Sequence, residues 1–360
     1  MTLKHRTQID TLPSYHQGKP APSLPGVRSY KLSSNENPFT PLDSVTEALA
    51  PALQRINRYP DMRGTAVVER LAQEIGVTTA NIQLGCGSTE VITQLVDFVA
   101  GAGDEVIYPW RSFEAYPIIV TGAGATSVQV PLTAAGTHDI DAMIAAVTDR
   151  TRLVIVNNPN NPTSTSVTDE QARKLLDAVP NDVVVLFDEA YFQFNADTDT
   201  SVAMDLFREY PNVVVAHTFS KAYGLAGLRI GYAVGPEEII EGMSKVALPF
   251  GVSDIAQTAA LASLDAYDEL SERVRVLVSE RSRVMTALED QGWHIPEPQA
   301  NFFWIPFGAK TAQAAERFTQ AGLSVRVFEP EGIRISMGES VANDTVIAVC
   351  AGLAKDGFLV

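Results

Sequence analysis

Cysteine is scarce in this sequence of 360 residues, and its scarcity excludes whole classes of structure. Only Cys86 and Cys350 are present, and they lie far apart along the chain. Two distant cysteines argue against a disulfide scaffold, and they exclude a zinc site built from cysteine pairs. We therefore expect no metal site. The 46% of apolar residues is instead enough to build a sizeable hydrophobic core.

Basic residues and long apolar runs are also few. Lys and Arg number 27 against 43 Asp and Glu, which gives a formal net charge of −16. Nucleic acids and anionic membranes attract basic surfaces, so this balance argues against both as partners. No apolar run is long enough to cross a bilayer, and residues 1–20 lack the continuous apolar segment of a secretory signal. We therefore expect a cytoplasmic protein.

The pattern between about residues 60 and 250 predicts a parallel sheet flanked by helices. Short apolar strands alternate there with helical stretches. Their continuous Val, Ile and Leu character suits strands that are buried on both faces. The predicted strands are Glu105–Tyr108, Leu153–Val156, Val183–Phe187 and Val213–Ala216. One intervening helix is marked by a capping box of Thr168 and Gln171.

The two ends of the chain differ from this middle part. Residues 1–30 are polar and rich in Pro and Gly, Pro13 and Gly26 among them, and they predict an extended arm. A long helical stretch, Ile255–Leu288, precedes three predicted strands and a last helix, at Asn301–Pro306, Ser324–Phe328, Gly332–Ser336 and Asp344–Ala354. The predicted fold class is α/β, with a large domain at residues 31–254. A smaller α+β domain follows at residues 255–360, with the arm packing near it.

Polar residues follow each of the four predicted strands of the large domain directly. The four clusters are Pro109–Phe113, Asn157–Thr163, Asp188–Tyr191 and His217–Lys221. In an open parallel sheet, ligands bind at the carboxyl ends of the strands. Each cluster alone is compatible with an ordinary turn, but four clusters at four strand ends indicate one shared site.

Asp188 stands out because it follows the apolar run Val183–Phe187 without a break. A carboxylate in that place is buried, and a buried carboxylate is costly to leave unpaired. The plain interpretation is a helix N-cap, which a lone Asp often provides. The functional interpretation gives Asp188 a buried cationic partner, such as a protonated pyridine nitrogen.

Lys221 and Arg229 lie in a turn rich in small and aromatic residues. Most lysines are solvated surface charges. An amine among small and aromatic neighbours can instead have a lowered pKa and act as a Schiff-base nucleophile. Arg229 is compatible with a surface ion pair, but the glycines before and after it, Gly224, Gly227 and Gly231, allow a close backbone approach. We interpret Arg229 as a bidentate phosphate ligand.

The segment Gly85–Glu90 precedes an apolar helical run. A glycine-rich turn at a helix N-terminus offers free N–H groups and the positive end of the helix dipole to an anion. Many helices begin in this way, so the segment alone is weak evidence. Its spacing matches neither a Walker A loop nor a dinucleotide-binding fingerprint, which disfavours NTP and NAD as ligands.

Together these segments resemble the fold-type I aminotransferases that depend on pyridoxal 5'-phosphate (PLP). The nearest resemblance is to the histidinol-phosphate aminotransferase branch, with its actinobacterial aromatic (phenylalanine) aminotransferase relatives. The similar segments run over nearly the whole chain: Ser34–Pro38, Asn57–Asp61, Gly85–Glu90, Asn160–Thr163, Asp188–Tyr191, Thr218–Arg229 and Gly332–Gly338. The stretch Phe219–Arg229 is highly specific to this family.

The resemblance implies a role for each matching residue around PLP. It implies that Lys221 holds the cofactor as a Schiff base and later moves a proton, and that Asp188 pairs with the pyridine nitrogen. Asn161 and Tyr191 would bond the phenolic oxygen of the cofactor, and Phe113 would stack on its ring. The residues implied around the phosphate are Gly87, Ser88, Thr218, Ser220 and Arg229, together with Tyr59 from a second subunit.

The resemblance also implies the substrate contacts. Arg334 matches the clamp for the substrate anion, because a guanidinium fork suits a carboxylate. The further substrate contacts are Asn35, Tyr15 and Arg326. The chain departs from the family pattern at Ser164, where glycine is frequent, and at Gly87 and Ser88, which replace an acidic pair found in some members.

We expect a homodimer with shared active sites that transaminates phenylalanine, tyrosine and tryptophan, with 2-oxoglutarate as the amino acceptor. The aromatic segment Trp110–Tyr116 favours aromatic substrates, and the carboxylates Glu329 and Glu331 beside Arg334 would oppose a substrate phosphate. The closest competing function is that of a histidinol-phosphate aminotransferase. A PLP-dependent lyase or decarboxylase would share the fold, and a binding protein without activity is the non-enzymatic hypothesis.

Overall fold

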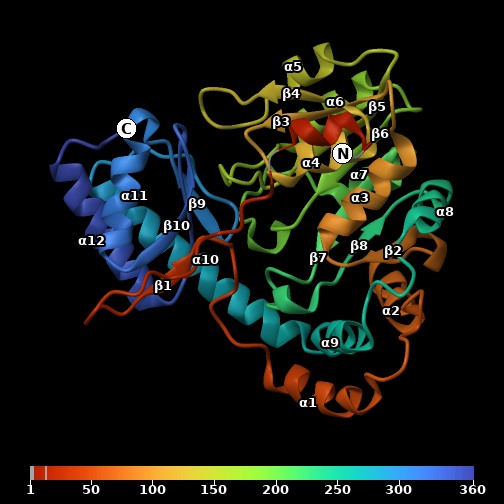
Figure 1. The fold of residues 1–360 in the computed structure, drawn as a ribbon, viewed down its shortest axis with the longest axis horizontal. Helices are drawn as coiled ribbons and strands as arrows, with labels where there is room; N and C mark the ends of the chain where they lie inside the picture. The colour runs from red at the N-terminus through yellow and green to blue at the C-terminus, as the bar shows by residue number, and fades with distance from the viewer. Residues whose placement is uncertain (1–3, 13) are drawn as a thin grey trace.

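Two β-sheets organise the computed structural model, which describes residues 4–12 and 14–360. Among these residues, the larger sheet has seven strands in the order β2-β8-β7-β6-β5-β3-β4, and the smaller has four in the order β1-β10-β11-β9. Figure 1 shows the two sheets side by side, with the helix α10 passing below the smaller one. The strands of the larger sheet are β2 (Ile82–Gly85), β3 (Glu105–Trp110), β4 (Thr126–Pro131), β5 (Thr151–Asn157), β6 (Val184–Asp188), β7 (Val213–Thr218) and β8 (Gly231–Val234).

The centre of the larger sheet confirms the prediction of parallel, doubly covered strands. The strands β3, β5, β6 and β7 pair in parallel, and β8 pairs antiparallel with β7 and β2. Alternate side chains along each strand enter two different core clusters, as a period of two requires. Helices α3 (Ser88–Val99), α4 (Ala115–Ala123) and α8 (Glu237–Val246) cover one face, and α5 (Ile140–Ala145), α6 (Asp169–Ala178) and α7 (Ala203–Glu209) cover the other.

The smaller sheet joins the two ends of the chain. Its strands are β1 (Tyr30–Leu32), β9 (Phe302–Ile305), β10 (Leu323–Phe328) and β11 (Gly332–Ser336). They pack against α11 (Thr311–Gln320), α12 (Ser340–Lys355) and the end of α10 (Tyr267–Asp290). The predicted strands and final helix are confirmed, but β1 was not predicted. Because β1 pairs with β10, residues 30–32 belong to the smaller sheet. The division at residues 31 and 255 remains a prediction.

The predicted helical stretch after residue 255 consists of two helices. The first is α9 (Asp254–Asp265) and the second is α10. Ala266 lies between them with φ −100° and ψ 25°, which is outside the helical region. The break lets α9 pack beside α1 (Asp43–Ala52) and α2 (Thr65–Ile75), while α10 runs toward the smaller sheet.

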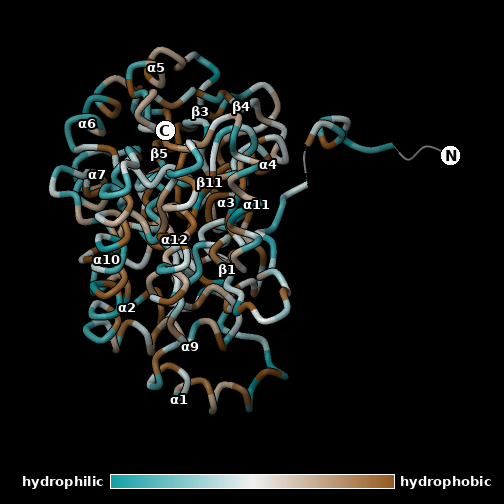
Figure 2. The backbone as a smooth tube through the Cα atoms, turned by 90° about the vertical axis from the view of Figure 1, so that its left-hand side faces the viewer, coloured by the Kyte–Doolittle hydropathy of each residue, from teal (hydrophilic) through white to brown (hydrophobic). Residues whose placement is uncertain are grey.

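The N-terminal arm runs along the outside of the molecule. Pro13 and the first three residues of the predicted arm lie outside the described residues. The 3₁₀ turn η1 (Thr7–Thr11) has no buried residue, and Arg6 donates to the carbonyl of Gly122 in α4 at 2.6 Å. In Figure 2 this part of the chain projects from the body of the molecule. No helix of the described residues is long and apolar enough to span a membrane.

Candidate active site

The polar residues at the ends of β5, β6 and β7 lie around one cavity. Asn157, Asp188 and Thr218 are the last residues of these neighbouring strands, and parallel pairing of β5, β6 and β7 places their ends at one edge of the sheet. The cavity has a volume of about 210 Å³. It is lined by Tyr15, Ser88, Thr89, Phe113, Asn157, Asn161, Asp188, Ala190, Tyr191, Thr218, Ser220, Lys221, Ala226 and Arg229. Residues from six separate segments therefore meet at the predicted edge.

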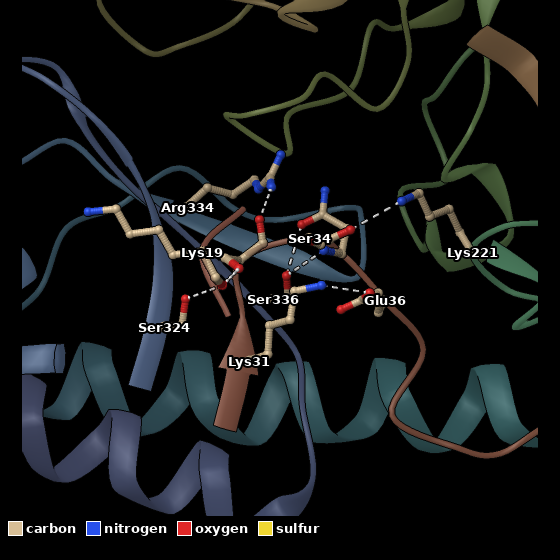
Figure 3. A network of polar contacts seen from close by, with 10 residues as sticks. Lys19, Lys31, Ser34, Glu36, Lys221, Ser324, Arg334 and Ser336 are labelled. Carbon is tan, nitrogen blue, oxygen red and sulfur yellow. Dashed lines mark hydrogen bonds and ion pairs between the residues drawn. The ribbon is translucent and has the colours of Figure 1, made fainter. Parts of the chain in front are cut away.

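Lys221 enters the cavity from the turn after β7. Its amine donates to the carbonyl oxygen of Ser34 at 3.3 Å, and Figure 3 shows the side chain pointing at that carbonyl. The amine lies 5.7 Å from the centre of the Tyr191 ring. Burial, and then the positive charge of Arg334, lower the pKa of Lys221 to about 8. A large share of the neutral amine is therefore present near that pH, which a nucleophilic lysine requires.

Asp188 is a buried carboxylate with one satisfied oxygen. Its Oδ2 accepts a hydrogen bond from the hydroxyl of Tyr116 at 2.6 Å, and its Oδ1 has no partner among the described residues. Desolvation raises the pKa of Asp188 to about 6, and the Tyr116 hydrogen bond opposes that rise. The helix-cap interpretation does not hold, because Asp188 ends β6 and the next helical turn begins at Phe192. The free oxygen at the cavity suits a cationic partner.

A cradle for an anion lies at the N-terminus of α3. Gly87 is the N-cap residue with φ 79°, and a Cβ built there would lie 2.5 Å from the Arg229 Nη2 atom. Gly87 is not among the residues lining the cavity, and its lack of a side chain is what lets Arg229 approach. Ser88 and Thr89 in the first helical turn line the cavity. Their position offers backbone N–H groups to a bound anion.

Arg229 completes this cradle from the opposite side. Its guanidinium donates to the carbonyls of Ala226 and Cys86 at 3.1 and 3.2 Å and to the Ser220 hydroxyl at 3.4 Å. It has no carboxylate partner in the part of the chain that the structure describes. The hydroxyl of Thr218 donates to that of Ser220 at 3.0 Å, so both hydroxyls are held at the same edge. An unpaired guanidinium beside two hydroxyls and a helix start suits a phosphate.

Asn161 and Tyr191 reach the cavity from the loops that follow β5 and β6, and residues outside the cavity hold them. Arg334, buried in β11, donates to the side-chain oxygen of Asn161 at 2.5 Å. The side chain of Asn35 donates to the hydroxyl of Tyr191 at 3.0 Å. Burial raises the pKa of Tyr191 to about 12, so its phenol keeps its proton at neutral pH.

Arg334 is a buried arginine without a carboxylate partner in the described chain. Besides Asn161, it donates to the carbonyl of Ser33 at 2.8 Å, and its Nε has no partner among the described residues. Figure 3 shows the dashed line from this guanidinium to the backbone carbonyl. Buried guanidinium groups are stable when they are paired, so Arg334 is ready to accept a carboxylate.

Two residues predicted for the site lie farther from the cavity. Arg326 is opposite Arg334 in the β10–β11 pairing, but it forms an ion pair with Glu114. Tyr59 is 84% exposed and stacks on Phe250 with ring centres 4.8 Å apart. Neither residue lines the cavity of its own chain. The role of Tyr59 in a second subunit remains a prediction.

Two residues at the site had no predicted role of their own, although both lie in segments that the sequence pattern indicated, Asn157–Thr163 and Trp110–Tyr116. Asn157 ends β5, and its side chain accepts from the backbone N–H of Asn161 at 2.8 Å and donates to the carbonyl of Asp188 at 3.1 Å. Tyr116 donates to Asp188. The strand-end rule that found Asp188 applies equally to Asn157. Tyr116 lies in the segment Trp110–Tyr116, whose aromatic residues indicated the substrate but not a contact with Asp188.

Comparison with known proteins identifies the family. The profile of the aminotransferase class I and II family matches residues 28–350. The chain therefore belongs to the class I and II aminotransferases, and it is an aminotransferase with the predicted α/β fold. It is 51% identical over 353 residues to the aromatic amino acid aminotransferase of Streptomyces coelicolor and 50% identical over 353 residues to that of Streptomyces avermitilis, covering 98% of both chains in each comparison.

A solved structure gives a similar picture of the fold. The histidinol-phosphate aminotransferase of Sinorhizobium meliloti in complex with pyridoxal-5'-phosphate superposes with a TM-score of 0.88 and 26% sequence identity. The match covers 99% of each chain. The histidinol-phosphate enzyme is thus similar in fold, whereas the aromatic enzymes are about twice as similar in sequence.

Proposed function

We propose that this aminotransferase moves the amino group of phenylalanine, tyrosine and tryptophan to 2-oxoglutarate with PLP as its cofactor. The observation that carries the proposal is identity of about 50% over nearly the whole chain to enzymes named aromatic amino acid aminotransferase. Histidinol-phosphate aminotransferase is the second candidate, because a protein of that name shares the fold at 26% identity.

The residues of the cavity fit PLP in three independent ways. Asp188 Oδ1 is a buried oxygen without a partner in the described residues, as a protonated ring nitrogen requires. Gly87 has φ 79°, which side chains rarely allow, and a Cβ there would displace the Arg229 guanidinium, so the cradle at α3 suits glycine. Lys221 supplies an amine whose pKa is about 8. When bound, the cofactor supplies an electron sink for the bond that breaks at the substrate Cα.

The proposed roles of the side chains follow from their positions. Lys221 would hold the cofactor and carry a proton on its Nζ, and Asp188 would keep a positive charge on the ring. Asn161 and Tyr191 would donate to the phenolic oxygen of the cofactor, and Phe113 would lie against its ring. The phosphate would be held by Gly87, Ser88, Thr218, Ser220 and Arg229, and the substrate by Arg334, Asn35 and Tyr15. Arg326 is paired with Glu114 outside the cavity, so its predicted substrate contact would require this ion pair to open.

The lining of the cavity supports an aromatic substrate. The argument from the carboxylates Glu329 and Glu331 against a phosphate substrate is weaker in the structure. Tyr15, Phe113 and Tyr191 all line the cavity, and aromatic rings pack well against one another. Glu331, however, forms an ion pair with Arg111 at 2.6 Å, and Glu329 is exposed. Glu331 is therefore neutralised and does not oppose a phosphate as a free carboxylate would.

The deciding experiment compares kcat/KM for phenylalanine, tyrosine and histidinol phosphate, since this ratio reports differential binding of the transition state. We expect phenylalanine or tyrosine to be preferred by about 10-fold or more, which corresponds to one well-buried aromatic contact. A clear preference for histidinol phosphate would assign the chain to the second candidate. Release of CO2 or ammonia without amino transfer would indicate a decarboxylase or lyase.

A further inference from the structure

Tyr116 contacts two residues of the cavity without lining the cavity itself. It lies in the first turn of α4 and is fully buried. Its hydroxyl donates to Asp188 Oδ2 at 2.6 Å, and its ring meets the Phe113 ring edge to face, with centres 5.5 Å apart at 88°. The backbone N–H of Tyr116 also donates to the carbonyl of Phe113 at 3.0 Å. The side chain of Tyr116 therefore contacts both the buried carboxylate of Asp188 and the ring of Phe113.

The hydrogen bond matters because it is the strongest of three interactions that stabilise the ionised Asp188, ahead of the backbone N–H of Ala190 and the nearby His217. Tyr116 provides the one side-chain hydrogen bond to this carboxylate among the described residues, and its other oxygen is free. A carboxylate that loses its donor in a buried place takes up a proton more readily. Tyr116 itself stays a donor, because burial and the neighbouring Asp188 raise the pKa of its phenol well above the usual value.

We propose that Tyr116 is a positioning residue that keeps Asp188 ionised and turned toward the cavity, so that the ring nitrogen of bound PLP holds the proton they share. This inference rests on the proposed function, because it assumes that PLP binds at Asp188. Through its edge contact with Phe113, the same tyrosine also fixes the position of the aromatic side chain against which the ring of bound PLP would lie.

A neighbouring tyrosine provides a matched control. Tyr108 is also fully buried, and its ring meets that of Tyr116 edge to face with centres 5.6 Å apart. Its hydroxyl accepts from Gln129 at 3.2 Å instead of reaching Asp188. Tyr116→Phe and Tyr108→Phe thus remove the same atom from the same aromatic cluster, and only the first removes a donor from Asp188.

The test uses holoenzyme loaded with PLP labelled with ¹⁵N in the ring, because the ¹⁵N resonance reports where the proton resides. In Tyr116→Phe we expect the resonance to move toward the value of unprotonated pyridine, as the proton passes to Asp188. In Tyr108→Phe it should stay at the wild-type value. The other ionisable groups around Asp188 are His217 of β7, Glu189, Tyr191 and Lys221, and they are the same in both variants.

Kinetics provide a second measurement. We expect kcat of Tyr116→Phe with phenylalanine to fall about 10-fold while KM changes little, because the lost hydrogen bond acts on the ring and not on the substrate. An unchanged resonance in Tyr116→Phe, or an equal shift in Tyr108→Phe, would overturn the inference. A protein that gives no cofactor resonance at all would instead refute the proposed function.

A second variant, which keeps the hydroxyl at position 116, tests the inference even if Tyr116→Phe does not fold. With 3-fluorotyrosine placed at position 116, the hydroxyl is a better donor and the ring is nearly unchanged in size. At a pH at which the wild-type ring nitrogen has begun to lose its proton, the fraction protonated should rise. A fall would contradict the positioning role even if Tyr116→Phe did not fold.

Discussion

At the scale of single residues, Lys221 lies where its amine is neither a surface charge nor a fixed ion pair. Burial and Arg334 lower its pKa to about 8, while its hydrogen bond goes to a neutral carbonyl. The neutral amine is the attacking form, so it becomes dominant as pH rises through this value. The rate at which Lys221 reacts with an aldehyde should therefore increase as the pH rises.

We predict that protein stripped of cofactor captures added PLP faster as pH rises, with a midpoint near 8. Arg334→Met should move the midpoint upward, because the arginine charge helps to lower the lysine pKa. Absorbance after rapid mixing measures the rate. A midpoint near the ordinary lysine value of 10.5 would contradict the burial argument.

Lys221→Ala provides the simplest check of the same residue. It should form no covalent link to PLP and should show no turnover, which mass spectrometry after borohydride reduction and an activity assay can record. Lys245→Ala is the control, because Lys245 is an exposed residue paired with Glu241 on α8. Near-normal activity in Lys221→Ala would refute its central role.

Asp188→Ala should retain part of the cofactor but lose roughly 100-fold or more in kcat, because the ring would lose its anionic partner. Asp188→Glu should be milder, since the longer side chain keeps the charge. Steady-state kinetics with phenylalanine and a titration of PLP separate the two effects. Wild-type kinetics in the Ala variant would leave the buried carboxylate without a catalytic role.

At the scale of elements, the loop between β5 and α6 forms hydrogen bonds with the segment that precedes β9 of the smaller sheet. Ser164 lies in this loop with φ 65°, a left-handed conformation that costs a residue with a side chain about 1–2 kcal/mol. Its hydroxyl accepts from the backbone N–H groups of Gln299 and Ala300 at 3.1 and 2.8 Å, just before β9. The two hydrogen bonds offset the strained backbone, which explains a serine at a position where glycine is frequent.

Ser164 therefore gives a ranked prediction for stability. Ser164→Ala should lose about 2 kcal/mol of unfolding free energy, because the strain stays and two hydrogen bonds disappear. Ser164→Gly should lose about 1 kcal/mol or less, because glycine adopts a positive φ freely. Urea unfolding measures the free energy of unfolding of both variants and shows which of them is less stable. A glycine variant less stable than the alanine variant would show that strain is unimportant there.

The elements also show how far the sequence could predict the fold and the site. Strands β3, β5, β6 and β7 were predictable because burial on both faces gives uninterrupted apolar runs. The three-residue strand β1 was not, because its pairing with β10 is a long-range contact without a local pattern. At the site, Asp188 was marked by its place after such a run. The Tyr116–Asp188 bond depends on how α4 packs on the sheet, which no local pattern encodes.

At the scale of the whole molecule, several apolar side chains close in sequence to the stacked Tyr59 and Phe250 are exposed, which is compatible with a second subunit. Tyr59 is 84% exposed, and Leu53, Ile56, Met62 and Leu248 are each more than half exposed. Exposed apolar surface often marks an interface. We propose a homodimer in which Tyr59 reaches the phosphate cradle of the partner. Light scattering should give the mass of two chains, and a fully active monomer would refute this.

Mixing two inactive or impaired variants tests whether the sites are shared. A dimer of one Lys221→Ala chain and one Tyr59→Ala chain contains one complete site, because the intact Lys221 and the intact Tyr59 meet there. After unfolding and refolding of an equal mixture, we expect about a quarter of the wild-type activity, since about half of the dimers are mixed and each has one good site. Activity no greater than the average of the two variants alone would exclude shared sites.

The pairing of β1 with β10 has a consequence for synthesis in the cell. Tyr30 leaves the ribosome early, but its partner Leu323 is made almost three hundred residues later. At roughly 5–20 residues per second, the first strand waits between about 15 seconds and a minute for its neighbour. All strands of the larger sheet are complete before then. The nascent chain should therefore acquire its larger sheet first, with an unpaired N-terminal strand exposed to chaperones until about the last tenth of the protein emerges.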